Sequence, residues 1–232
     1  KQSIAYLLQQ IAFLEPYENA ERSLELLHKS LEIYFELNDK IEIAGVLKHI
    51  GSMFHHYGAS AYKRSEPKYE KALTYYNRAL DIAKEIDDKL MICKVQCEIA
   101  LIFESYKGGK AEESLELYLN IIEEAEKIDN RGMMSHALRR VAFHEAIHNG
   151  NYKKSLNYFK KSYDIEKELG KKSGMALTLV SIADNYIQTK EYSKALEHIE
   201  KSIILQKEVN FEGIELWSKT ILFIGYKELE IE

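Results

Sequence analysis

A small side chain recurs at one position of a helical pattern along the chain. It follows an isoleucine or a valine each time, and its successive spacings are 39, 49, 42 and 41 residues. A recurrence of this length is the signature of a repeat architecture. A small residue on each helix lets two helix axes approach to ~8–10 Å while larger neighbours interdigitate around it. The positions are Ala12, Gly51, Ala100, Ala142 and Ala183.

A second small residue opens a second helical pattern in every repeat, and a large apolar residue follows it four positions later. In the last repeat the first pattern is Leu179, Ile182 and Tyr186, and only 189–191 separate it from the second. A link this short predicts an antiparallel helical hairpin. The small and large positions pair as Ser23 with Leu27, Ala72 with Tyr76, Ser114 with Tyr118, Ser155 with Phe159, and Ala195 with Ile199.

These patterns resemble the tetratricopeptide repeat. Its first helix is matched by Leu47-x2-Ile50-Gly51-x2-Phe54 and by Leu179-x2-Ile182-Ala183-x2-Tyr186, and its second by Ala72-x3-Tyr76 and Ser155-x3-Phe159. The period of about 40 residues exceeds the usual 34, and the closing proline is absent. Long repeats of this kind are similar to those in bacterial signalling and regulatory proteins.

The resemblance implies an all-α fold, a right-handed α-solenoid (a superhelix) of antiparallel hairpins that each contact only their neighbours. We predict a single domain over residues 1–232, because the repeat is continuous. The terminal helix either caps the array or continues into a further hairpin. The predicted repeats are 3–39, 40–88, 89–130, 131–171 and 172–211, followed by a terminal helix over 212–230.

Composition narrows the function classes. The net charge is −5, whereas nucleic-acid binders usually carry a basic excess, so we expect no nucleic-acid partner. No apolar run approaches ~18–20 residues, and we expect no membrane span. Cys93 and Cys97 lie one helical turn apart and are poorly placed for a disulfide. We expect both to pack in or near the core of a cytoplasmic protein that needs no cofactor.

One motif points to an enzyme. His144-Glu145-Ala146-Ile147-His148 spells H-E-x-x-H, which on a helix places two imidazoles on one face for zinc and a glutamate to activate water. However, the motif lies in register with the repeat, and Glu145 falls where sister repeats carry Phe54, Phe103 and Tyr186. We therefore predict helix-end histidines in solvent, no catalytic residue and no metal site, and keep zinc binding by His144 and His148 as the alternative.

The insertion Gly58–Lys68 is the one irregularity of the repeats, and it places Lys63 and Arg64 around Tyr62. Insertions in repeat arrays map to loops, often on a binding face. A solvated loop and a binding loop both fit this pattern.

First helices line the concave groove in proteins of this type, so their residues not needed for packing are the candidate partner site. The middle of this groove is basic although the chain is acidic, which favours an anionic partner. The alternative is ordinary surface charge on exposed helices. The predicted groove residues are Phe13, Lys48, His49, Lys94, His136, Arg139, Arg140, Phe143 and Asp184.

We therefore predict a non-catalytic scaffold module that binds an acidic protein or peptide segment on the groove. A second hypothesis is a regulatory receptor for a short peptide, coupled to an effector domain outside this sequence. A zinc hydrolase built on His144, Glu145 and His148 is the third. The sequence leaves the oligomeric state, the partner and the pathway open.

Overall fold

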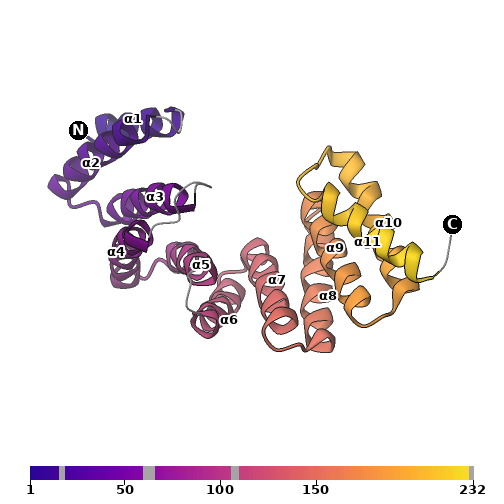
Figure 1. Ribbon diagram of the computed structural model, residues 1–232. Coiled ribbons are helices and arrows are strands. Elements are labelled where there is room, and N and C mark those ends of the chain that lie inside the picture. Colours follow the sequence, from indigo (N-terminus) through magenta and orange to yellow (C-terminus); the bar gives the residue numbers. More distant parts are fainter. Residues whose placement is uncertain (16–18, 60–65, 106–109, 230–232) are drawn as a thin grey trace. The chain divides into compact units, whose positions relative to one another are not determined.

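A computed structural model describes residues 1–15, 19–59, 66–105 and 110–229, with side chains left undescribed at 56–68 (Figure 1). The chain divides into two compact units, Lys1–Leu117 and Tyr118–Glu232. The described residues form eleven helices and no strand. The predicted all-α fold is therefore confirmed, while the single domain stays a prediction.

Helices α1 to α5 belong to the first unit, and α7 to α11 belong to the second; the division falls within α6. Two helices fall within each predicted repeat to within one residue, and the last helix falls within the predicted terminal one. The bounds are α1 Gln2–Leu14, α2 Ala20–Glu36, α3 Lys40–Ala59, α4 Glu66–Glu85, α5 Lys89–Ser105, α6 Ala111–Lys127, α7 Arg131–Ile147, α8 Tyr152–Glu168, α9 Lys172–Gln188, α10 Tyr192–Val209 and α11 Glu215–Glu228.

The recurring small residues lie where helices approach most closely. A Cβ added to Gly51 would stand 2.7 Å from the ring of Tyr76, so α3 meets α4 there without room for a methyl group. Ala142 and Ala183 are fully buried at the matching positions of the second unit. The large residues that follow the second small position are equally buried; they are Leu27, Tyr76, Tyr118, Phe159 and Ile199.

Buried serines fasten the hairpins. Ser30 on α2 donates a hydrogen bond to the carbonyl oxygen of Ala5 on α1 at 2.9 Å. Ser162 donates in the same way to Ser135 at 2.8 Å, and Ser202 to the carbonyl of Ala176 at 2.7 Å. A small residue at this position therefore keeps the helices close and also satisfies its own buried hydroxyl group.

In four hairpins a basic residue at the start of the first helix, or just before it, pairs with a glutamate at the far end of the same hairpin. The exposed pairs are Lys1 with Glu36, Lys40 with Glu85, Arg131 with Glu168, and Lys172 with Glu208. Exposed pairs of this kind contribute little free energy, at most ~1 kcal/mol each. Their recurrence shows that the start of α1 lies beside the end of α2, as in the later hairpins.

The linkers turn through the left-handed region. Asn38, Asp87, Asp129 and Gly170 have φ near +50° to +65° after the second helices, and Lys190 has φ +61° after α9. The next residue then donates its N–H back across the helix end, as Glu191 does to Tyr186 at 2.8 Å. Asparagine, aspartate and glycine tolerate this backbone, whereas lysine does not.

Lys190 is therefore a strained position, and Lys190→Gly should raise the free energy of unfolding by about 1 kcal/mol. Urea unfolding followed by circular dichroism measures the change. The matched control is Gly170→Ala, which should lower stability by a similar amount, because a Cβ at Gly170 meets no atom within 4 Å and only the backbone is strained. A Lys190→Gly variant less stable than the native chain would contradict this explanation.

Candidate functional site

Four predicted groove residues gather on the first helices of the first unit; we call Phe13, Lys48, His49 and Lys94 the unit 1 cluster. The ring centroid of Phe13 lies 4.6 Å from that of His49, edge to face, which joins α1 to α3. Lys48 and His49 are half-buried, whereas Lys94 on α5 is exposed. Burial lowers the pKa of Lys48, so this cation is partly deprived of water.

A polar network on α3, α4 and α5 borders the unit 1 cluster. The hydroxyl of Tyr76 donates to Glu98 Oε2 at 3.2 Å and also lies 3.1 Å from Ser52 Oγ. His55 Nδ1 stands 3.6 Å from the same carboxylate oxygen. Hydrogen bonding by His55 holds the pKa of Glu98 below its usual value, although burial opposes this effect. Glu98 is therefore engaged by its own surroundings.

His49 is neutral at pH 7. Burial, reinforced by the charges of Lys48 and Lys94, lowers its pKa from 6.5 to about 4. Its Nδ1 is buried without a hydrogen-bond partner among the described residues. A third positive charge beside the two lysines would be costly, so the imidazole of His49 stays uncharged.

In the second unit, Arg140, Phe143, Asp184 and Trp217 form the unit 2 cluster. Phe143 on α7 and Trp217 on α11 approach with ring centroids 6.4 Å apart, although a complete hairpin separates their helices in sequence. The guanidinium of Arg140 lies 5.7 Å from the Phe143 ring and 5.9 Å from the Tyr118 ring. The sequence analysis missed Trp217, although it is the one tryptophan of the chain and falls on a predicted first helix.

Asp184 is the acidic member of the unit 2 cluster. Burial raises the pKa of its carboxyl group, and hydrogen bonds from the Trp217 indole and Gln188 partly offset the rise. The cluster therefore places a cation, two aromatic rings and a carboxylate on α7, α9 and α11. It can offer apolar contact, charge and hydrogen bonding to one extended segment.

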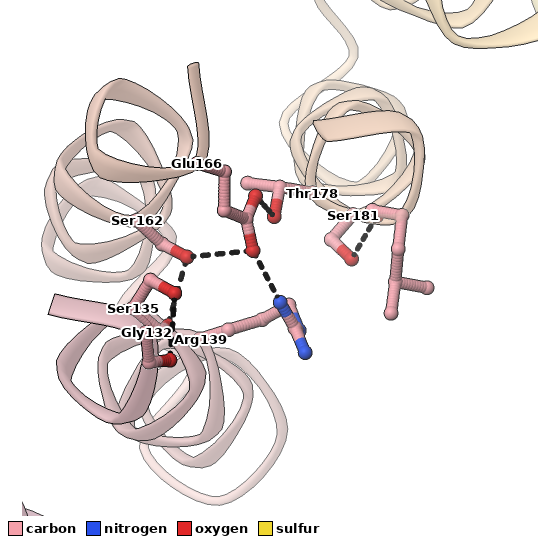
Figure 2. Close-up of polar contacts among 8 residues, drawn as sticks. Gly132, Ser135, Arg139, Ser162, Glu166, Thr178 and Ser181 are labelled. Carbon is pink, nitrogen blue, oxygen red and sulfur yellow. Dashed lines mark hydrogen bonds and ion pairs between the residues drawn. The ribbon is translucent and has the colours of Figure 1, made fainter. Parts of the chain in front are cut away.

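Arg139 has a different role from its neighbour Arg140. Figure 2 shows its guanidinium reaching Glu166, with Arg139 Nη1 2.5 Å from Glu166 Oε1. Thr178 donates to the other carboxylate oxygen at 2.7 Å, and Ser162 lies 3.4 Å from the first. This ion pair is buried and joins α7, α8 and α9. Arg139 thus binds a carboxylate, but one from its own chain.

Residues 133–208 match the sequence profile of the tetratricopeptide repeat. These residues are tetratricopeptide repeats, as predicted. None of the curated proteins matches the chain.

Solved structures of the same fold cover nearly the whole chain. BtubC (BKLC) from P. vanneervenii has a TM-score of 0.77 at 15% identity, over 90% of this chain and 82% of that one. A Signal Transduction ATPase with Numerous Domains that carries a tetratricopeptide repeat sensor, from Pyrococcus horikoshii, has a TM-score of 0.77 at 20% identity, over 97% and 32%. A Rap protein complexed with competence and sporulation factor has a TM-score of 0.71 at 19% identity, over 97% and 59%. The chain thus spans less than two thirds of the last two proteins.

The H-E-x-x-H motif contributes to packing of the tetratricopeptide array. Glu145 is buried and forms an ion pair with Lys154 at 2.5 Å and a hydrogen bond from Asn149 at 3.1 Å, and these contacts help to lower its pKa. His144 is also buried, and the prediction that it is solvated is wrong; His148 is exposed as expected. In the described part of the chain, no three His, Cys, Asp or Glu side chains are placed to hold a metal ion.

The remaining predicted positions have mixed outcomes. His136 is half-buried on α7, and His55, which the predicted groove residues do not include, is buried on α3. Cys93 is buried, Cys97 is half-buried, and both are free thiols, as predicted. Tyr62, Lys63 and Arg64 lie outside the described residues. Among the described helices, none is both long and apolar enough to span a membrane.

His49 should make stability depend on pH. Its folded-state pKa of about 4 lies below the unfolded value of 6.5, so the stabilisation is complete above pH 6.5 and is lost as the pH falls from 6.5 towards 4. The loss attributable to His49 should reach about 3 kcal/mol at most. Urea unfolding of the native chain and of His49→Gln at pH 7 and pH 4.5 isolates this contribution. Equal pH dependence in the two proteins would contradict it.

Removing the cation of the buried pair should destabilise the second unit. Arg139→Leu leaves Glu166 buried without its cation, and we expect a loss of about 3 kcal/mol in the free energy of unfolding, measured in urea. The double variant Arg139→Leu/Glu166→Gln should recover most of this loss, because Gln206 fills the matching position of the next hairpin with hydrogen bonds to Ser202 and Ser218. A double variant as unstable as the single one would refute the buried-charge explanation.

Proposed function

We propose that this chain is a non-catalytic module that binds protein or peptide segments on its first helices. At the unit 1 cluster the bound segment is acidic, and the predicted groove residues form the contact surface. The two clusters carry the proposal, because a repeat fold by itself hosts many unrelated activities.

The observation that carries the proposal is a pair of lysines, Lys48 and Lys94, that form no ion pair with the described residues. The charge of Glu98 acts on Lys48, but its carboxylate is already contacted by Tyr76 and His55. The charges of the two lysines act on a buried, neutral His49. A carboxylate from a partner would relieve the repulsion between the lysines, and it would gain strength from the partial exclusion of water.

The unit 2 cluster is proposed as a separate contact surface, and its character is mainly apolar. Phe143 and Trp217 are half-buried, so each ring is already held in place before a partner arrives. Aromatic anchors of this kind carry a large share of binding free energy in interfaces. Arg140 lies over the Phe143 ring, and we place it in the binding surface in preference to Arg139, which forms a buried ion pair with Glu166.

A regulatory receptor for a short peptide is the second candidate. Two of the similar structures are described as a tetratricopeptide repeat sensor and as a Rap protein complexed with competence and sporulation factor. The difference from the scaffold hypothesis is an effector coupled to binding. A full-length gene that carries an output domain would favour the receptor, and an array without one would favour the scaffold.

A panned library of 12-residue peptides, followed by fluorescence anisotropy with the enriched sequences, tests the proposal. We expect enrichment of Asp and Glu, and at least about a tenfold loss of affinity for Lys94→Glu/Arg140→Glu. The control with the same charge change is Lys84→Glu/Lys160→Glu, at exposed second-helix positions, which should bind nearly as the native chain does.

NMR of the His49 ring adds a local measurement. An anion bound beside Lys48 and Lys94 should raise the pKa of His49 above its free value of about 4. Peptides that bind equally well to both double variants, with an unchanged His49 pKa, would overturn the proposed site.

A further inference from the structure

The outer face of α1 carries large apolar side chains in solvent. Ile4, Leu7, Ile11 and Leu14 are 56%, 57%, 44% and 84% exposed. Their spacing of three, four and three residues places them in one stripe along the helix. The opposite side of α1 is well packed, since Ala5 is fully buried and Ala12 nearly so.

The repeat register identifies what this stripe should contact. Ala12 corresponds to Ala100, so the four positions of α1 correspond to Ile92, Val95, Ile99 and Ile102 of α5. All four α5 residues are at most 7% exposed. Three of them pack in one core with Tyr76 and Ala79 of α4, the second helix of the preceding hairpin.

The other first helices repeat this arrangement. On α3 the matching positions Ile43, Val46 and Ile50 are at most 3% exposed, and α2 packs against that helix. On α9 the matching residues Thr178 and Asn185 receive contacts from α8, through Glu166 and Ser155. The preceding second helix thus covers these positions, and α1 alone among these first helices exposes them.

The apolar character of the stripe determines which kind of helix can pack on it. On α9 the matching positions include Thr178 and Asn185, which pair with polar groups of α8. On α1, as on α5, all four are apolar and offer no hydrogen bond. A helix like α4, which presents Ala72, Tyr76 and Ala79 in its buried face, fits the stripe, whereas a helix like α8 would bury Glu166 without a partner.

We infer that the Ile4–Leu7–Ile11–Leu14 stripe is a docking surface for the second helix of another tetratricopeptide-type hairpin, placed before α1 in the array. The occupant is an amphipathic helix with small residues flanking one large apolar side chain, as in α4. The inference is independent of the proposed peptide-binding function.

A duplication tests the docking directly. Lys1 corresponds to Lys89 in the register, so a copy of residues 40–88 fused directly before Lys1 recreates the α4–α5 junction. Hydrogen exchange measured by mass spectrometry should show the amides of α1 slowed by about tenfold or more relative to the chain without the copy. Unchanged exchange in α1 would overturn the inference.

A matched variant separates the stripe from the new linker. The copied Asp88 can cap α1 as it caps α5, where its carboxylate accepts from the N–H of Met91 at 2.9 Å. Leu7→Glu/Ile11→Glu keeps this cap but removes the apolar contact, so it should abolish most of the slowing in the fusion. Slowing that persists in this variant would assign the effect to the cap and overturn the inference.

The same two substitutions in the unfused chain complete the test. Because both side chains are exposed, Leu7→Glu/Ile11→Glu should leave the unfolding midpoint nearly unchanged. Light scattering over a range of concentrations should give the same molar mass for the native chain and for the variant, with no dimer of the native chain that the variant fails to form. A dimer lost in the variant would show that a second copy covers the stripe, against the inference.

Discussion

The fold depends on how closely two helices can approach within a hairpin. At Gly51 the approach to the Tyr76 ring leaves no space for a methyl group, and buried alanines hold the matching positions elsewhere. Such contacts gain dispersion energy only when the surfaces fit without voids. Because each hairpin buries its apolar faces on its neighbours, one close contact sets the register of the next hairpin, and local packing propagates along the array.

Close helices bring polar groups out of water, and the structure satisfies them in recurring ways. Ser30, Ser162 and Ser202 each donate to a carbonyl oxygen of the facing helix. Where a hairpin carries a larger polar group, the contacts become specific: Glu166 takes Arg139 and Thr178, while Gln206 contacts Ser202 and Ser218. A buried charge is tolerated only with its partners, so the Arg139–Glu166 pair ties three helices to one another.

This requirement also decides which charges are available for recognition. Arg139 and Arg140 are adjacent in sequence, yet one is held by Glu166 and the other lies over aromatic rings. Glu98 is contacted by Tyr76 and His55 and acts on Lys48 only through its charge, so Lys48 and Lys94 form no ion pair in the described part of the chain. The available cations on the first helices are therefore those that the structural pairs do not use.

The sequence by itself determined the helices, their pairing and the packed positions. Small and large residues at a fixed register form a local pattern, and this pattern recurs in every repeat. It also placed Phe13 beside the basic positions of α3, since both fall on first helices. Only the tertiary structure decided that Arg139 is paired, that His144 is buried, and that Trp217 reaches Phe143 across an intervening hairpin. These outcomes depend on side chains from helices far apart in sequence. The repeat register predicts where a residue lies on its helix, but it does not predict which distant side chain contacts that residue.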